Sequence, residues 1–207
     1  MPTNFPSGVQ SRGVPVEGFG GIGSPLLTMG NIYHVDSGAD TADNDNAGTN
    51  PKQPLATLDG AIGKCTASNG DVILVHPGHA ETVSAAAAIT FDVAGVTVIG
   101  MGTGNSRPTI TLDTATSTDI NVTADDTQIH NMIFSMNYAD IAAPFDLSAA
   151  GFVLNQCRFV DTAASMNFVE LVVCTTTNNE CDRFTFTNNY VDSPDTGNDC
   201  IVQIGGD

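Results

Sequence analysis

The chain of 207 residues is long enough for one domain with a substantial core, and 6 basic against 23 acidic residues give it a net charge of −17. This charge repels phosphate backbones and anionic lipid headgroups, which argues against a nucleic-acid-binding or membrane-surface protein. No run of 18 apolar residues is present, and the N-terminus lacks the pattern of a secretory signal, so we expect synthesis in the cytoplasm and no membrane span.

Residues 1–31 form an arm rich in Gly and Pro that cannot bury much apolar surface by itself. Its spaced apolar residues suit an extended arm that anchors to a partner, and a disordered leader is the alternative interpretation. The candidate docking residues are Phe5, Val9, Val14, Val16 and Phe19.

Residues 32–66 are expected to form a strand, an acidic loop and a helix. The alternation in "IYHV" predicts the strand, and the helical spacing of Leu55, Leu58 and Ile62 predicts the helix. The loop between them lacks the spacing and terminal Glu of an EF-hand, so a solvated loop is favoured over a calcium site. The carboxylates that a calcium ion would use are Asp36, Asp40, Asp43 and Asp45.

The cysteines and histidines show no spacing typical of a cofactor or metal site. Five cysteines without a Cys-x-x-Cys pair favour reduced, mostly buried thiols over a disulfide framework or a zinc site. These are Cys65, Cys157, Cys174, Cys181 and Cys200. The histidines are scattered along the chain, so a structural role is expected for each, and no cofactor is indicated. They are His34, His76, His79 and His130.

Residues 67–207 contain short β-rich runs separated by Thr, Asn, Asp, Ser and Gly, with no second helix. The Asn-Gly or Asp-Gly turns of antiparallel hairpins are missing between these runs. Strand motifs recur every 25 to 32 residues, as in "CRFVDTA" (157–163) and "NNYVDSP" (188–194). A period of this length with two or three strands predicts a solenoid of the parallel β-helix type.

Equivalent side chains of such a solenoid stack in ladders, because successive coils pair in parallel. Alignment on the aromatic ends of the runs predicts a core ladder of Phe134, Phe159 and Tyr190. A second predicted ladder contains Ile129, Leu154 and Phe186. A corner lined by amide side chains is predicted at Asn131, Gln156 and Asn188.

The segments "YHVDSGADTADNDNAGTNPKQPLATLDGAI", "GDVILVHPGHAETV" and "VTVIGMG" together resemble the opening of pectin-lyase-like β-helix proteins. The matching residues are Val35, Asp36, Pro54, Thr57, Leu58, Ala61, Ile62, Asp71, Ile73, Val75, Pro77, Gly78, Glu81 and Gly100. The resemblance covers about residues 32–207 and implies an all-β, right-handed parallel β-helix (solenoid) with an N-terminal capping helix behind the extended arm. It does not specify function, because lyases, hydrolases and structural virion parts share this fold.

One segment suggests an enzyme. "DTGNDCIVQI" (195–204) is similar to the "GDDCIAI" coil of polygalacturonases, which hydrolyse glycosidic bonds with paired carboxylates. Asp195 and Asp199 are the candidate acids, but Asn198 replaces the adjacent Asp of that motif, and the later Gly-His-Gly and Arg-x-Lys elements do not follow. We therefore favour an Asx-rich turn and expect no enzyme.

The first residues, "MPTNFPSGVQSRGVPV", look like the starts of small proteins encoded among the head genes of tailed bacteriophages. This resemblance implies a structural virion protein that decorates the capsid surface, and we expect a homotrimer bound to the major capsid protein or another virion protein. The alternative is a tail spike or fibre that binds or degrades host polysaccharide. An adhesin would need exposed aromatic residues, and the chain has three Tyr and no Trp.

Overall fold

The computed structural model describes residues 28, 30–174 and 181–194, together with the backbone of the strand at 200–204. The predicted docking residues of the arm lie outside the described residues: Phe5, Val9, Val14, Val16 and Phe19. The candidate acids Asp195 and Asp199 lie outside them as well. No helix in the described part of the chain is long and apolar enough to cross a membrane.

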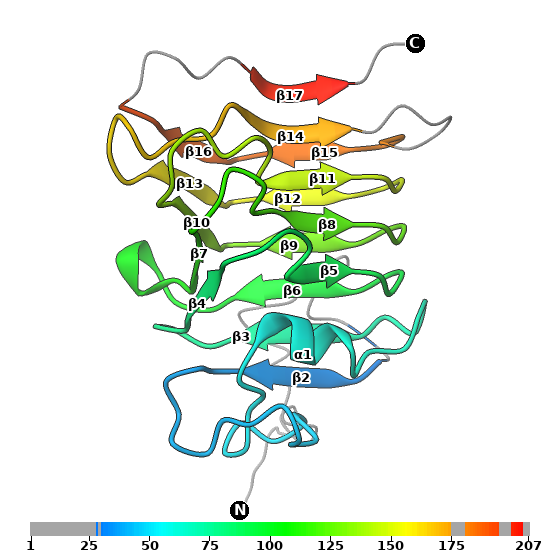
Figure 1. The fold of residues 1–207 in the computed structure, drawn as a ribbon. Helices are drawn as coiled ribbons and strands as arrows, with labels where there is room; N and C mark the ends of the chain where they lie inside the picture. The colour runs from blue at the N-terminus through cyan, green and yellow to red at the C-terminus, as the bar shows by residue number, and fades with distance from the viewer. Residues whose placement is uncertain (1–27, 29, 175–180, 195–199, 205–207) are drawn as a thin grey trace, which may run out of the picture.

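The described chain winds into a parallel β-solenoid made of three sheets, which confirms the predicted parallel β-helix (Figure 1). The β3 sheet contains β2 (Ile32–Val35), β3 (Val72–Val75), β6 (Thr97–Gly100), β9 (Gln128–His130), β12 (Val153–Asn155) and β15 (Thr185–Thr187). The β4 sheet contains β4 (Ala80–Val83), β7 (Thr109–Leu112), β10 (Ile133–Met136), β13 (Arg158–Asp161) and β16 (Tyr190–Asp192). The β5 sheet contains β5 (Ile89–Phe91), β8 (Ile120–Val122), β11 (Phe145–Leu147), β14 (Glu170–Cys174) and β17 (Cys200–Ile204).

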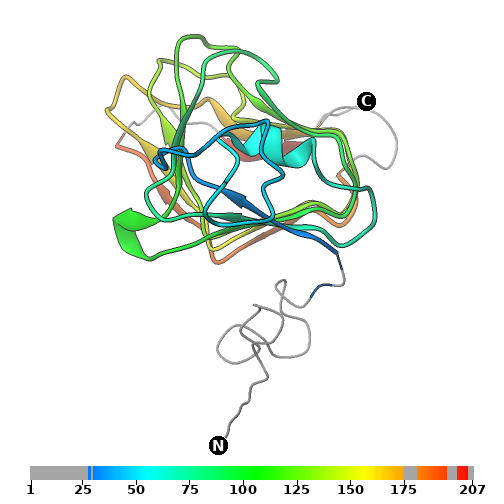
Figure 2. The same ribbon diagram turned by 90° about the horizontal axis from the view of Figure 1, so that it is seen from below.

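Successive coils stack so that each strand pairs in parallel with the equivalent strand of the next coil. The end-on view in Figure 2 shows these coils superposed around a common axis. Alternate residues of each strand point inward and form the core, and the others face outward. The predicted ladder of Ile129, Leu154 and Phe186 is confirmed by the strand register.

The core ladder that we predicted in the β4 sheet is correct for two residues and wrong for the third. Phe134 pairs with Phe159, and their rings stack with centroids 5.4 Å apart. Tyr190 instead pairs with Arg158 and is 61% exposed, while Val191 occupies the position above Phe159. The two copies of the Val-Asp motif are therefore offset by one residue in the strand register, because Val160 pairs with Asp192. A shift of one residue in a strand moves each side chain to the opposite face.

A further aromatic neighbour of Phe159 comes from a different sheet. The ring of Phe186, in β15, stacks on Phe159 with centroids 5.7 Å apart. Phe145, in β11, meets Phe134 edge to face at 5.0 Å. The core is therefore a set of rings contributed by all three sheets.

The predicted amide corner is confirmed. Asn131, Gln156 and Asn188 stand at equivalent places between the β3 and β4 sheets, and each has a positive φ, of 57°, 59° and 56°. Asn tolerates this left-handed backbone better than most residues because its short side chain bonds to nearby backbone. The Asn131 amide donates to the carbonyl oxygens of Gly100 and Gly102 in the preceding coil, at 2.7 and 3.0 Å.

The helix predicted around Leu58 is present as α1 (Leu58–Ile62). Its apolar residues Leu58, Ala61 and Ile62 are buried, and it packs against β5, β2 and β3. A short 3₁₀ helix, η2 (Gly104–Ser106), follows β6. α1 lies at the end of the solenoid where β2 is found (Figure 1).

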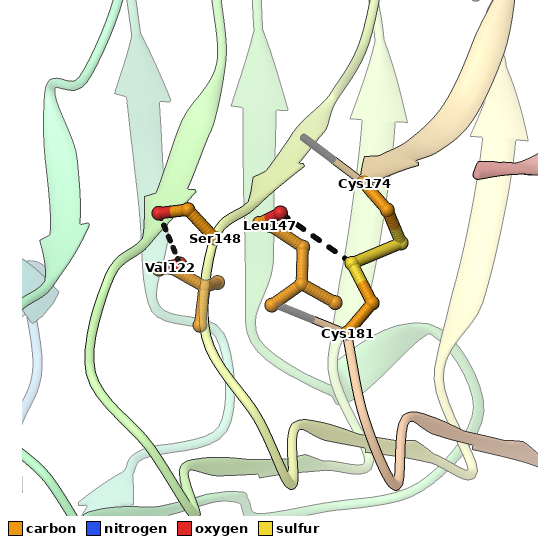
Figure 3. The surroundings of a disulfide bond; sticks show 5 residues. All are labelled: Val122, Leu147, Ser148, Cys174 and Cys181. Carbon is orange, nitrogen blue, oxygen red and sulfur yellow. Dashed lines mark hydrogen bonds between the residues drawn. A yellow bond between two sulfur atoms is a disulfide. The ribbon is translucent and has the colours of Figure 1, made fainter. Parts of the chain in front are cut away.

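The expectation of reduced thiols is wrong for one pair of cysteines. Cys174 and Cys181 form a disulfide with their Cα atoms 6.0 Å apart (Figure 3). The fold brings them together because Cys174 ends β14 and Cys181 stands at the corner before β15. Cys65 and Cys157 are free, and burial raises the pKa of each thiol to about 12, which keeps both protonated and unreactive at neutral pH.

The ladder assignment predicts different costs for two aromatic truncations. Phe159→Ala removes a fully buried ring that contacts three other rings, and we expect a loss of about 3–5 kcal/mol in the free energy of unfolding. Tyr190→Ala removes an exposed ring and should change it by about 0.5 kcal/mol or less. Urea unfolding followed by circular dichroism measures both, and equal losses would contradict the register.

Candidate functional site

The end of the solenoid near β2 and β3 gathers three histidines and two carboxylates. His34 and Asp36 come from β2 and the residue that follows it, and His76, His79 and Glu81 come from the turn after β3 and from β4. Strand pairing brings these residues together, because His34 stands opposite Leu74 and therefore close to the residues that follow β3. This group is the main concentration of titratable side chains that the described fold assembles from distant positions.

The outer part of the group is a chain of polar contacts from Asp36 to His34. The Nδ1 atom of His76 lies 3.8 Å from a carboxylate oxygen of Asp36, and Nε2 of His76 lies 3.0 Å from Nδ1 of His34. Burial, followed by repulsion from His76, lowers the pKa of His34. The His34 imidazole is therefore neutral near pH 7, and its Nδ1 forms a single hydrogen bond with the facing nitrogen of His76.

The inner part of the group connects the first two coils with α1. The backbone N–H of Ser37 donates to Nδ1 of the fully buried His79 at 3.0 Å, so Nε2 carries the proton and donates to Glu81 at 3.2 Å. The same Glu81 oxygen accepts the backbone N–H of Leu58, the first residue of α1, at 2.8 Å. Glu81 thus satisfies one of the free N–H groups at the helix start.

The predicted acidic loop is stabilised by its own amide side chains. The Asn44 side-chain oxygen accepts from the backbone N–H groups of Ala56 and Thr57, and the Asn46 amide donates to the carbonyl oxygens of Thr41 and Pro54. Two of the predicted calcium ligands form turns within the loop, because Asp36 and Asp43 each accept a backbone N–H two residues further on. In the described chain, no three His, Cys, Asp or Glu side chains are placed to hold a metal ion.

Asp71 is a second carboxylate that connects separate segments. It is 1% exposed and accepts three hydrogen bonds, from the backbone N–H groups of Asn31 and Thr66 and from the Asn69 amide, at 2.6, 2.7 and 2.7 Å. The hydroxyl of Thr28 donates to the carbonyl of Gly70 beside it. The last residues of the N-terminal arm are therefore held against the corner that precedes β3.

The outer face of the β4 sheet carries the most exposed aromatic side chain of the described residues, Tyr190. Its strand neighbour Arg158 forms an ion pair with Asp192 at 2.7 Å. Arg107 lies close by, with its guanidinium donating to the carbonyl of Gln156 at 3.0 Å. Aromatic, cationic and anionic groups thus share one surface.

Comparisons with family models, curated proteins and solved structures find no match to this chain. What the structure shows is a parallel β-solenoid. Sequence reasoning included Asp71 and Glu81 among the residues that match the pectin-lyase-like pattern, but it gave neither a role. The role of Glu81 could have been predicted, because a carboxylate at an inward position of an alternating strand needs a hydrogen-bond donor inside the protein.

Removal of the Glu81 carboxylate should weaken the junction between α1 and the solenoid. Glu81→Ala leaves the Leu58 N–H and His79 without their acceptor, and we expect a loss of about 1–3 kcal/mol in the free energy of unfolding. Asp40→Ala, at an exposed position of the acidic loop, is the matched loss of one carboxylate and should cost about 0.5 kcal/mol or less. Urea unfolding of the three proteins tests this, and an unchanged stability for Glu81→Ala would contradict the role assigned to Glu81.

Two histidines predict how stability depends on pH. Burial lowers the pKa of His34 and His130 in the folded protein, so the unfolded chain takes up protons first as the pH falls below about 6.5. Their contribution to stability is complete above that pH and is lost as the pH falls through the folded pKa values. The double variant His34→Gln/His130→Gln should therefore lose less stability than the wild type between about pH 8 and pH 5. Urea unfolding at both pH values checks this, and parallel pH dependences would show that neither histidine contributes.

Proposed function

We propose that the protein is a structural virion protein of a tailed bacteriophage, which decorates the capsid surface as a homotrimer. The arm binds the shell through its apolar residues, with the major capsid protein or another virion protein as partner. The solenoid projects outward as a stiff, acidic body. No catalytic role is proposed for it.

The observation that carries this proposal is the junction between the arm and the solenoid. Asp71 binds the backbone of Asn31 and of Thr66 at once, and Thr28 bonds to Gly70, so a force on the arm is transmitted to the first coil. The solenoid itself is held by parallel strand pairing along its length. A stiff body whose N-terminal segment is firmly attached suits a protein that is displayed on a surface. The likeness of the first residues to phage head proteins supports the same conclusion.

We also propose that the solenoid is right-handed and of the pectin-lyase-like type, with α1 as its N-terminal cap. Three residues of the matching pattern support this, because they begin the helix, bind it to β4 and fix the corner that follows it. Thr57 accepts the N–H of Gly60 at the start of α1, Glu81 accepts that of Leu58, and Asp71 holds the corner before β3. These are the contacts that a cap needs in order to stay on the end of a solenoid.

Cryo-electron microscopy of the intact phage particle tests the location. The expected result is three-fold solenoid density at regular positions on the head, with residues 1–31 ordered against the shell. Density confined to the tail, or no density, would overturn capsid decoration. Light scattering of the purified protein tests the oligomer, for which the proposal expects a mass of about three chains of 21.4 kDa.

A binding assay isolates the role of the arm. Phe5→Ser/Val9→Ser removes two apolar side chains from the arm, and we expect it to weaken co-sedimentation with heads that lack the protein by about ten-fold or more. Asp40→Asn changes an exposed residue of the acidic loop and should bind as the wild type does. Equal binding of all three proteins would contradict anchoring through the arm.

The alternative, a tail spike or fibre that binds host polysaccharide, is favoured by one observation. Tyr190 is exposed beside Arg158 and Asp192, and an aromatic ring next to hydrogen-bonding groups suits a sugar ring. If this alternative is correct, isothermal titration with host polysaccharide gives binding that Tyr190→Ala abolishes and Tyr138→Ala leaves unchanged. Tyr138 is the matched control because it is also exposed, in the turn after β10.

A further inference from the structure

We propose that the disulfide of Cys174 and Cys181 is a redox-sensitive clasp, which holds the start of the last coil on the coil before it. Cys174 ends β14, and Cys181 stands at the corner before β15, so the bond joins one coil to the beginning of the next. Reduction of the bond opens β15 and β16, while the earlier coils stay folded. The clasp is independent of the proposed function.

The connection between β14 and β15 is longer than its equivalents in the earlier coils. Five residues each join β5 to β6, β8 to β9 and β11 to β12, at 92–96, 123–127 and 148–152, whereas ten residues join β14 to β15, at 175–184. A longer connection loses more conformational entropy when its ends are held at a fixed spacing. The last coil therefore needs a contact that fixes its start.

The disulfide gives this longer connection the end spacing of a shorter one. The N–H of Cys181 donates to the carbonyl oxygen of Ala149 at 3.1 Å, so Cys181 stacks on Ala149. The strand register places Cys174 opposite Leu147. Because only Ser148 separates Leu147 from Ala149, the disulfide links two places that a single residue links in the coil before. Figure 3 shows this stacking, in which Sγ of Cys181 lies 3.6 Å from the carbonyl oxygen of Leu147.

The backbone that follows the disulfide is held in an unfavourable conformation. Cys181 and Arg183 have positive φ angles of 70° and 62°. Gly151 has the same place as Arg183 in the coil before, with a φ of 76°, and its N–H donates to the carbonyl oxygen of Asp182 at 2.7 Å. Left-handed residues other than glycine persist only where the surrounding structure holds them. The segment therefore relaxes when its anchor is removed.

The non-covalent contacts of this segment are weaker than those inside the solenoid. Phe184 stacks on Phe152 with ring centroids 5.9 Å apart, but Phe184 is only partly buried, whereas Phe152 is fully buried. The ion pair of Arg183 with Asp126, at 2.7 Å, is largely exposed on both sides, and such pairs contribute little to stability. Once the disulfide is reduced, the start of the last coil depends on these contacts.

Thiol–disulfide exchange closes and opens the clasp. One cysteine thiolate attacks glutathione disulfide and expels a glutathione thiolate, and the second cysteine thiolate then attacks the mixed disulfide at the protein sulfur and expels the other. Two protein thiols and one glutathione disulfide thus become one protein disulfide and two glutathione molecules, and dithiothreitol drives the reverse reaction. Reducing surroundings such as a cytoplasm open the clasp, and oxidising surroundings close it.

The two cysteines differ from the free thiols in their access to such reagents. Cys181 is only partly buried, so exchange reagents reach the bond from its side, although Cys174 is 1% exposed. Burial raises the pKa of Cys65 and of Cys157 to about 12, so neither forms the thiolate that exchange requires near pH 7.

Hydrogen exchange of the full chain, followed by mass spectrometry, tests the clasp. Protein oxidised with glutathione disulfide is compared with protein reduced by dithiothreitol. The reporting amides are those of Thr185 and Tyr190, which donate to the carbonyl oxygens of Phe152 and Cys157 at 2.9 and 3.0 Å. Reduction should speed exchange in the peptides that contain them at least about ten-fold, because it frees the chain that the disulfide restrained. Exchange in β3 and β6 should change by about two-fold or less.

A variant that lacks both thiols but keeps the packing provides the matched test. Cys174→Val/Cys181→Ala introduces the residues found at equivalent places in earlier coils, Val122 and Ala149. This variant should exchange like the reduced wild type in either buffer, and its exchange in β3 and β6 shows whether it is folded. Cys65→Ala removes one of the free thiols and should keep the full response to dithiothreitol.

Three outcomes would overturn the proposal. Equal exchange of β15 and β16 before and after reduction would show that the bond does not hold the last coil. Faster exchange throughout the chain would show that reduction unfolds the whole solenoid. Peptide mapping that finds Cys174 and Cys181 unpaired after oxidation, or paired with other cysteines, would contradict the clasp itself. The capsid proposal stands apart from all three, because the co-sedimentation assay tests it separately.

Discussion

In-register parallel stacking of the coils is the constraint on which the rest of the structure depends. Because each strand pairs with its equivalent in the next coil, a side chain that points inward in one coil is placed above an inward side chain of the coil before. The core is then a column of ladders such as Phe134 on Phe159. Coil length varies in the connections that enter and leave the β5 sheet, whereas the corner of Asn131 and its equivalents, Gln156 and Asn188, has the same length in these three coils and contains a left-handed residue.

Stacking also creates two ends and three outer faces, and different residues cover each of them. At the end near β2, the acidic loop takes the place of a further coil, because the N–H of His34 donates to the carbonyl of Gly48 and the N–H of Leu55 donates to the carbonyl of His34, both at 2.8 Å. Glu81 accepts the backbone N–H of Leu58 at the start of α1, and Asp71 accepts those of Asn31 and Thr66. Asp71 thereby holds the residue before β2 against the corner that precedes β3.

The outer faces differ because the outward residues of each strand are free of the packing constraint. In the β4 sheet this freedom places Tyr190, Arg158 and Asp192 on the surface. In the β3 sheet it leaves a strip without formal charge in a strongly acidic protein. Such a contrast is relevant to function because charge repulsion limits which face can be covered by a second protein segment.

The sequence alone determined the fold class, the repeat, the ladder of Ile129, Leu154 and Phe186, the corner at Asn131 and the position of α1, since each follows from local periodicity or from a residue with a special backbone preference. It did not determine the exchange of Tyr190 for Val191, the disulfide of Cys174 with Cys181, or the roles of His79, Glu81 and Asp71. These depend on the lengths of the connections between coils. A connection longer by one residue reverses which side chains face inward, and only the three-dimensional path of the chain brings distant donors to a buried carboxylate.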